Sequence, residues 1–321
     1  MEDEQLTRYL QQIANLIQGV HARQVDLIER QLLLSGRQAS LASSHRAALG
    51  DLTEAEFSVH SQTGEDGIID WLVEHLPISS RRFVEFGVGD YRESNTRFLL
   101  RHRNWKGLVM EASAANVEAI RQDPISWRHD LTAGRHFLTR DSIDGLIAGY
   151  GFDGDIGILS VDTDGNDYWI LEAIECARAD ILICEYNAVF GDLHAVSVPY
   201  VENFDRTRMH PSNLYWGASI RAFERLAAAK GYTFIGGNVA GHNAFFVRDA
   251  LVGHLDIARR VAHPSLFRDS RDEAGRLTHV GGLARAGLIQ HAPLIDVATG
   301  DAVTLAGLGE LYSAEWLARM R

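Results

Sequence analysis

The chain has 321 residues, of which 46% are hydrophobic, and a formal net charge of -12 at pH 7, which fits one large domain or two smaller ones with a real core. The negative charge argues against non-specific binding to nucleic acid or to anionic membranes, and no run approaches the roughly 20 apolar residues that span a bilayer. Two cysteines cannot build a disulfide framework and the first residues form no apolar signal sequence, so we expect a protein of the reducing cytoplasm.

Residues 4 to about 48 predict one long helix with a heptad repeat. Apolar side chains and glutamines recur at alternating steps of four and three residues, at Leu6, Leu10, Ile13, Ile17, Val20, Gln24, Leu27, Gln31, Leu34, Gln38 and Leu41. This spacing is typical of a coiled coil, in which polar seam residues can fix register and oligomer state. We interpret residues 1–50 as a helical segment for self-association. The alternative is an amphipathic helix that lies on its own catalytic domain, because Gly36 interrupts the stripe.

From about residue 55 the pattern changes to short apolar strands that alternate with helices. The predicted strands lie at 82–86, 107–111, 136–139, 156–161, 180–185, 232–235 and 243–247, and the last two are interpreted as a hairpin pair. This alternation predicts an α/β fold with a mostly parallel sheet, an antiparallel last strand and helices on both faces. We expect this domain to span residues 51–255, and the mixed, Gly-rich residues 256–321 to form an appended lobe without an assigned role.

Glycines and an acid follow the first two predicted strands. The first strand runs into Glu85-Phe-Gly87-Val-Gly89, where the glycines let the backbone approach a ligand closely. The second strand ends in Glu111, about 20 residues later, where a carboxylate can accept hydrogen bonds from both hydroxyls of a ribose. Together these features predict an adenosine site. Asp90 places negative charge where the pyrophosphate of NAD would lie, which favours S-adenosylmethionine instead.

Several segments resemble class I S-adenosylmethionine-dependent methyltransferases, and most of all the FkbM-type branch. They are FVEFGVGDYRESNTRFLL, GLVMEAS, GILSVDTDGNDYWILEAI, ILICEYNAVFG and GYTFIGGNVAGHNAFFVR, in the order typical of that family over roughly residues 57 to 250. The usual strand-four motif of the branch is K-I-D-x-E-G-x-E, whereas this chain has Ser160-Val-Asp162-Thr-Asp164-Gly-Asn-Asp167. The lysine is absent and aspartates replace both glutamates.

The resemblance implies a Rossmann-like class I methyltransferase sheet that follows the long N-terminal helix, with S-adenosylmethionine as cofactor. The residues that it assigns to cofactor binding are Glu85, Gly87, Gly89, Glu111, Ser113, Gln62 and Asp162.

Acidic side chains crowd the ends of the fourth and fifth strands. Asp162 and Asp164 follow the fourth strand, and Glu185 and Asn187 follow the fifth. If these strands are neighbours, the four side chains form an oxygen-rich site for Mg²⁺ or another divalent cation, which would hold and acidify an acceptor hydroxyl. Asp167, in the first turn of the next helix, has a capping role as its simplest interpretation.

Methyl transfer to a hydroxyl also requires a group that accepts its proton. We predict His194 as this base, with Asp162 beside it, because the loop after the fifth strand opens onto the active face; His210 and His242 are the alternatives. The long stretch 192–216 is typical of a lid or an acceptor site.

These features predict an S-adenosylmethionine-dependent O-methyltransferase. The resemblance implies a sugar hydroxyl, in a glycan or a glycosylated small molecule, as acceptor. Two other interpretations stay open. Asp162-Thr-Asp164 also matches the D-x-D of a metal-dependent glycosyltransferase, and a Rossmann-like domain on a coiled coil could serve as a non-catalytic oligomeric scaffold.

Overall fold

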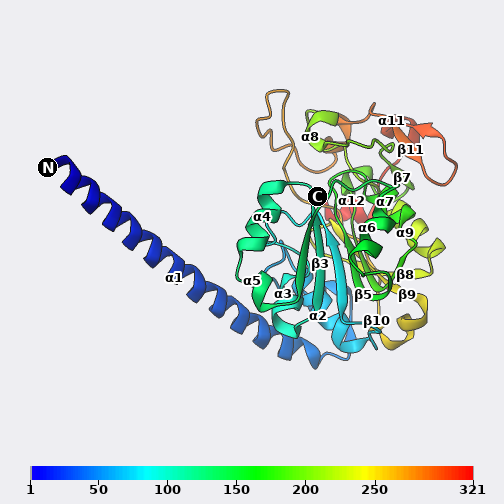
Figure 1. Cartoon of the computed structure of the whole chain (residues 1–321). Coiled ribbons are helices and arrows are strands. Elements are labelled where there is room, and N and C mark those ends of the chain that lie inside the picture. Colours follow the sequence, from blue (N-terminus) through cyan, green and yellow to red (C-terminus); the bar gives the residue numbers. More distant parts are fainter. Residues whose placement is uncertain (1, 321) are drawn as a thin grey trace.

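The computed structural model describes residues 2–320 and is built around a seven-stranded sheet (Figure 1). The strands are β2 (Arg82–Phe86), β3 (Lys106–Glu111), β4 (Leu131–Arg135), β5 (Gly154–Val161), β6 (Ala177–Glu185), β8 (Tyr232–Gly237) and β9 (Asn243–Arg248). Their order is β4-β3-β2-β5-β6-β9-β8, and β9 is antiparallel to both of its neighbours while the other pairs are parallel. This sheet confirms the predicted fold class, since its order and its one antiparallel strand are those of the class I methyltransferase sheet.

Helices cover both faces because the strand side chains alternate between two cores. Val84 and Leu108 point into one core, which packs against α6 (Ile143–Gly149), α7 (Asp167–Ala173) and α9 (Ile220–Ala229). Phe83 and Val109, one residue away in each strand, point into the other core. That second core packs against α2 (Glu65–His75), α3 (Arg97–Arg103), α4 (Ala114–Gln122) and α5 (Ile125–Arg128).

The N-terminal helix α1 (Glu2–Ser44) extends away from the rest of the molecule and contacts it only near its C-terminal end (Figure 1). Gly36 lies against the domain, where an added Cβ would approach a ring carbon of Phe98 to 2.7 Å. Ser40 contacts His102 at 3.1 Å, and Glu29 forms an ion pair with Arg101 at 3.1 Å. The glycine that interrupts the apolar stripe therefore lies where the helix packs against the domain without room for a side chain.

The third strand differs from its prediction. The sequence pattern placed it at 136–139, whereas β4 lies at Leu131–Arg135 and the segment 136–139 is a loop. Leu131 and Ala133 pack against the core, but a glycine and two polar residues complete this strand and hide its alternation. The more apolar residues that follow turn away from the sheet to line a pocket.

The C-terminal residues pack directly against the domain built on the seven-stranded sheet. The short strand β10 (Asp256–Ile257) pairs with β1 (Ala48–Leu49), and β7 (Val196–Ser197) joins β11 (Leu294–Asp296) and β12 (Ala302–Val303) in a second small sheet. Tyr312 and Trp316 belong to the same core as β5 and β6.

The remaining elements are α8 (Arg206–Met209), α10 (Ala284–Leu288), α11 (Leu305–Leu308), α12 (Ala314–Arg319) and the 3-10 turns η1 (Leu52–Ala55), η2 (Ala188–Phe190) and η3 (Asp249–His254). Among the described residues, no helix has the length and apolar character needed to cross a membrane.

Candidate active site

The carboxyl ends of β2, β3 and β5 meet at the edge of the sheet where open α/β folds bind their ligands. Gly87 follows β2 with φ of +69°, and an added Cβ would overlap the backbone carbonyl oxygen of Asp162 at the end of β5. Gly89 has φ of +53°, with open space where a side chain would stand. Gly87 therefore permits close packing of two strand ends, and Gly89 leaves bare backbone facing a ligand.

Glu111 ends β3, and its carboxylate is held beside these glycines. One oxygen accepts a hydrogen bond from the backbone N–H of Gly89 at 3.1 Å, and the other accepts one from the N–H of Ser113 at 2.8 Å. Glu111 lines a pocket of about 360 Å³, whose apolar wall consists of Met110, Phe137, Leu138 and Phe204. An apolar slot with a fixed carboxylate in its wall fits an adenine and the hydroxyls of its ribose.

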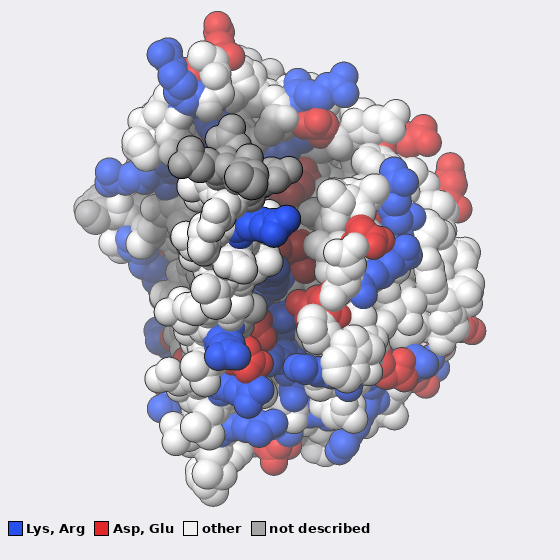
Figure 2. Space-filling model, turned by 60° about the vertical axis from the view of Figure 1, so that its left-hand side comes forward, with Lys and Arg blue, Asp and Glu red and all other residues white. Residues whose placement is uncertain are grey.

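A second pocket of about 410 Å³ continues from the first. Both pockets have Gly87, Gly89 and Asp164 in their walls, so together they form one cleft along the strand ends. Figure 2 shows Asp and Glu side chains recessed in a hollow of the surface. The second pocket is also lined by Gln62, Glu85, Asp162, Glu185, Arg206, His242 and Asn243.

Three carboxylates gather in this second pocket. Asp162, Asp164 and Glu185 each offer one oxygen, and these oxygens lie within 4.8 Å of one another. Burial raises the pKa of Asp162 well above its usual value, and the charges of Asp164 and Asp167 raise it further. Burial, followed by the charges of Asp162 and Asp164, raises the pKa of Glu185 in the same way. One oxygen of Glu185 is buried without a hydrogen-bond partner among the described residues. Such a donor set fits a hard divalent cation, which would relieve the repulsion.

Arg206, which begins α8, supplies a positive charge at the edge of this cluster. Its guanidinium contacts Asp164 at 3.1 Å and Asp269 at 3.1 Å, and it lies over the ring of Trp216. The long stretch 192–216 therefore reaches the cleft through Phe204 and Arg206 and not through its histidines.

Asn187 does not join the carboxylate cluster, which corrects the predicted set of metal ligands. Its amide nitrogen donates to the carbonyl oxygens of Leu214 and Trp216, both at 2.9 Å, and its amide oxygen accepts from the N–H of Val189. All its hydrogen-bonding groups thus hold the loop after β6. Asp167 does not cap its helix, which corrects its simplest interpretation: α7 has no side-chain cap, and Asp167 accepts from the N–H groups of Thr163 and Gly165 in the loop before the helix.

His194 lies away from the cleft, which corrects the predicted base. Its Nε2 contacts the carbonyl oxygen of Glu310 at 2.8 Å, on the side of the C-terminal segment, because the chain turns away from the strand ends after η2. His210 contacts Ser212 and likewise lines none of the cleft among the described residues. His242, the remaining candidate, lies in the wall of the second pocket.

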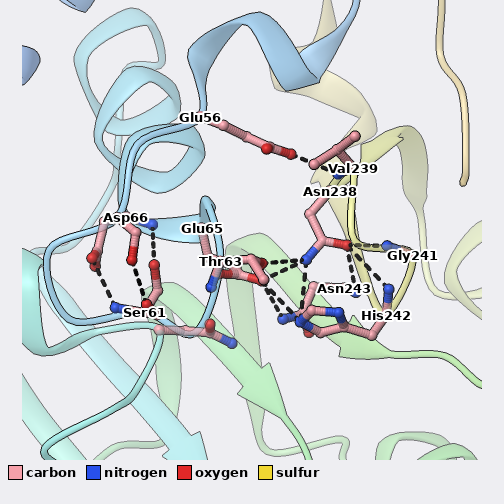
Figure 3. A network of polar contacts seen from close by, with 12 residues as sticks. Glu56, Ser61, Thr63, Glu65, Asp66, Asn238, Val239, Gly241, His242 and Asn243 are labelled. Carbon is pink, nitrogen blue, oxygen red and sulfur yellow. Dashed lines mark hydrogen bonds and ion pairs between the residues drawn. The ribbon is translucent and has the colours of Figure 1, made fainter. Parts of the chain in front are cut away.

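A buried network orients His242 (Figure 3). Its Nε2 lies 3.2 Å from Glu65, whose carboxylate is fully buried and also accepts from the amides of Asn238 and Asn243. The amide nitrogen of Asn238 also lies 3.2 Å from Nε2, but it donates to Glu65 and to the hydroxyl of Thr63. Because Glu65 is an acceptor, we assign an imidazole hydrogen to Nε2, which leaves Nδ1 as the possible acceptor. Nδ1 is buried and has no partner among the described residues.

Of the other predicted cofactor residues, some line the cleft and one caps a helix beside it. Gln62 and Glu85 line the second pocket. The carboxylate of Glu85 accepts from the backbone N–H groups of Asn95 and Thr96 at 2.8 and 3.2 Å, and burial raises its pKa to about 7. Ser113 caps α4 by accepting from the N–H of Asn116 and is absent from the described lining of the cleft.

A third cavity of about 130 Å³ adjoins the second pocket and was not predicted. It shares Gln62, Glu185, Arg206 and His242 with that pocket. Its far wall comes from the C-terminal residues Ser265, Phe267, Asp269 and Arg285. The sequence around these residues has no motif, so only the folded chain reveals that the tail closes the site.

No protein-family model and no curated protein sequence matches the chain. Among solved structures it is similar to the CurJ carbon methyltransferase, with 11% identity, a TM-score of 0.37 and coverage of 61% of this chain and 56% of that one. It is also similar to the N-terminal domain of EvdMO1 with S-adenosylhomocysteine bound, with 10% identity, a TM-score of 0.38 and coverage of 68% and 94%. A third is an S-adenosylmethionine-dependent methyltransferase from Clostridium acetobutylicum, with 9% identity, a TM-score of 0.37 and coverage of 57% and 90%.

The chain thus spans little more than half the length of the CurJ methyltransferase. These likenesses are distant, so the assignment of the fold rests on the strand order and on the antiparallel β9. The chain has the Rossmann-like fold of the class I S-adenosylmethionine-dependent methyltransferases.

Proposed function

We propose that this protein is an S-adenosylmethionine-dependent O-methyltransferase of the FkbM type that uses a divalent cation. The observation that carries the proposal is the continuous cleft, in which the Gly87–Gly89 segment separates a slot for adenosine from a cluster of three carboxylates. A cofactor that lies across the glycines would have its reactive end beside the carboxylates, where an acceptor hydroxyl can approach in line.

The cofactor contacts follow from the lining of the first pocket. Glu111 accepts hydrogen bonds from the ribose hydroxyls, and Met110, Phe137 and Leu138 pack against the adenine. Gln62 and Asp162, in the second pocket, contact the amino-acid end. When bound, S-adenosylmethionine supplies the electrophilic methyl group.

Asp162, Asp164 and Glu185 would hold the divalent cation, with Mg²⁺ as the first choice, because all three offer hard oxygen ligands. When bound, the cation supplies Lewis-acid activation of the acceptor hydroxyl. The unpartnered oxygen of Glu185 supports this assignment, since a buried carboxylate oxygen without a donor is costly unless a ligand completes it.

His242 is the proposed base in place of His194. Its Nδ1 accepts the acceptor proton while Glu65, on Nε2, fixes the tautomer and stabilises the imidazolium that forms. The acceptor is proposed to be a sugar hydroxyl in a glycan or a glycosylated small molecule. The FkbM resemblance supports this choice, as do the polar side chains of Gln62 and Asp269 and the ring of Trp216 in the third cavity.

Thermal unfolding with and without ligands tests this proposal. We expect S-adenosylhomocysteine at 100 times its Kd to add about 2.7 kcal/mol of stability to the chelator-treated protein. Mg²⁺ should add a further increment, which Glu185→Gln removes while it leaves the response to S-adenosylhomocysteine intact. Stabilisation by a UDP-sugar with Mn²⁺, and none by S-adenosylhomocysteine, would contradict the proposal and favour the glycosyltransferase interpretation.

A further inference from the structure

The third cavity contains a buried positive charge that the methyl-transfer chemistry does not use. Arg285 is 3% exposed and lines this cavity. One guanidinium nitrogen donates to the carbonyl oxygen of Ser265, while Nε is buried and has no partner among the described residues. No carboxylate of the described chain lies within ion-pair distance of it, and the only carboxylate charge that acts on it from farther away is that of Asp269. Asp269 lines the same cavity, but its carboxylate is already bound by Arg206 at 3.1 Å.

A buried guanidinium that forms no ion pair, and whose nearest acid is already bound by another arginine, is expensive to keep, so it marks a place where a ligand supplies negative charge. Arginine binds carboxylate and phosphate groups through two parallel N–H donors, a geometry that a neutral sugar cannot match. The cavity shares Glu185 and His242 with the acid-lined pocket, so one molecule can place a hydroxyl at the carboxylates and extend a second group toward Arg285.

We infer that the acceptor carries an anionic group, a carboxylate or a phosphate, which Arg285 binds in the third cavity. This inference rests on the proposed function, because it deepens the description of the acceptor of that same site. Arg285 would act as a specificity residue, since it contacts a part of the acceptor that does not react.

The test compares three sugars that share one ring and differ only at carbon six: glucose, glucuronate and glucose 6-phosphate. Each is titrated into the full-length protein saturated with S-adenosylhomocysteine. We expect either glucuronate or glucose 6-phosphate to bind at least ten-fold more tightly than glucose. The sugar that binds more tightly shows whether the anionic group of the acceptor is a carboxylate or a phosphate. Arg285→Gln should abolish the preference and Arg285→Lys should retain part of it, whereas Arg268→Gln, an exposed position in the same segment, should leave it unchanged.

Equal binding of all three sugars to the unmodified protein, or a preference that survives Arg285→Gln, would overturn the inference. The affinity for S-adenosylhomocysteine, measured in the same samples, reports separately on the proposed function. Its absence from the unmodified protein contradicts methyl transfer, whereas its presence without an anion preference contradicts only the role of Arg285.

A second, independent observation concerns the free face of α1. The apolar heptad residues of this helix are all between 52% and 64% exposed: Leu6, Leu10, Ile13, Ile17, Val20, Leu27, Leu34 and Leu41. A different set of residues is in contact with the domain or buried against it: Glu29, Gly36, Ser40 and Ser43. When the seam residues are numbered as heptad positions a and d, these residues are at positions c and f, on the side of the helix away from the seam. The contact with the domain therefore leaves the apolar stripe uncovered along the whole helix.

We propose that this stripe binds the α1 helix of a second copy of the chain as a parallel coiled coil. A helix of 43 residues is about 64 Å long, enough for several heptads of seam. The seam glutamines Gln24, Gln31 and Gln38 argue for another helix and against a lipid surface, because amide side chains can pair across a seam but are costly in hydrocarbon. Arg23, Arg30 and Arg37 flank the seam at g positions, and a parallel arrangement keeps these charges from facing one another.

Sedimentation equilibrium of the full-length protein tests this second proposal. We expect a dimer at micromolar concentration and a monomer for the seam variant Ile13→Asp/Leu27→Asp. The matched control Val25→Asp changes an exposed apolar residue outside the seam and should leave the dimer intact. A monomeric unmodified protein, or a dimer that the seam variant does not weaken, would overturn it. Unchanged affinity for S-adenosylhomocysteine in both variants verifies that the domain is folded.

Discussion

Replacement of Glu65 by alanine should destabilise the protein more than almost any other single change at the site. The Glu65 carboxylate is 0% exposed and accepts hydrogen bonds from the amides of Asn238 and Asn243 at 2.5 and 3.0 Å and from the hydroxyl of Thr63 at 2.7 Å (Figure 3). It also faces Nε2 of His242 at 3.2 Å. Alanine would leave the buried amide of Asn243 and Nε2 of His242 without this acceptor and would remove one of the two acceptors of the Asn238 amide.

The expected magnitude follows from these contacts. A hydrogen bond to a charged group contributes about 1.5–3 kcal/mol, and removal of one partner from a buried charged network costs about 3–5 kcal/mol in total. We therefore expect Glu65→Ala to lower the free energy of unfolding by about 3–5 kcal/mol, a large share of the roughly 5–15 kcal/mol typical of a folded protein. The control Glu56→Ala removes one hydrogen bond, from the N–H of Val239, at a half-exposed position and should cost about 1 kcal/mol.

Urea denaturation at several pH values measures how much stability Glu65→Ala removes and how that loss depends on pH. Burial alone would raise the pKa of Glu65, but His242, Asn243 and Thr63 outweigh it and hold the pKa well below its usual range. The stabilisation is thus complete above the unfolded pKa of about 4.3 and is lost as the pH falls toward the folded pKa. The difference between the native protein and Glu65→Ala should be constant near neutral pH and shrink below about pH 4. A cost under about 1 kcal/mol at pH 7, or one that grows with acidity, would refute this reasoning.

Three further changes test the site directly. Gly87→Ala should abolish binding of S-adenosylhomocysteine in calorimetry and lower the free energy of unfolding by at least about 2 kcal/mol, because the added Cβ overlaps the end of β5. Gly89→Ala should cost only about 1–2 kcal/mol, the penalty for a left-handed backbone conformation. Equal effects of the two variants would contradict this packing. Glu185→Gln should raise the melting temperature in the presence of chelator, since it removes a crowded carboxylate, and a lower melting temperature would argue against repulsion in the cluster. His242→Ala should slow methyl transfer about 10²–10⁴-fold without loss of affinity for S-adenosylhomocysteine, while His194→Ala should not, and the reverse result would restore the original choice of base.

The arrangement of the half of the cleft that we propose for the cofactor could be predicted from the sequence because it depends on local rules. Gly87 and Glu111 each follow a recognisable strand, and the ends of parallel strands meet at one edge of a sheet. Asp162, Asp164 and Glu185 were predicted in the same way, and the structure brings their oxygens together. β4 was misplaced because its own residues carry little β-pattern, while the apolar residues beside it line a pocket.

The half of the cleft that we propose for the acceptor could not be predicted because its arrangement depends on long-range packing. His194 and His242 both follow strand-like segments, and only the path of the chain after β6 decides which one reaches the cleft. Asn187 has the right chemistry for a metal ligand, but the returning loop at Leu214 uses its amide. Arg285 lies about 100 residues beyond β6 in a segment without a motif, so no spacing rule of the kind used for strands and helices links it to the site.

The most direct test of the account is calorimetric titration of the full-length protein with S-adenosylhomocysteine, beside Glu111→Ala and the matched control Glu118→Ala on the exposed face of α4. We expect micromolar binding by the native protein and by Glu118→Ala, and at least a hundred-fold loss, about 2.7 kcal/mol, for Glu111→Ala. Absence of binding to the native protein, or equal affinities for all three proteins, would contradict the claim that the cleft beside Gly87 and Gly89 is a methyltransferase cofactor site.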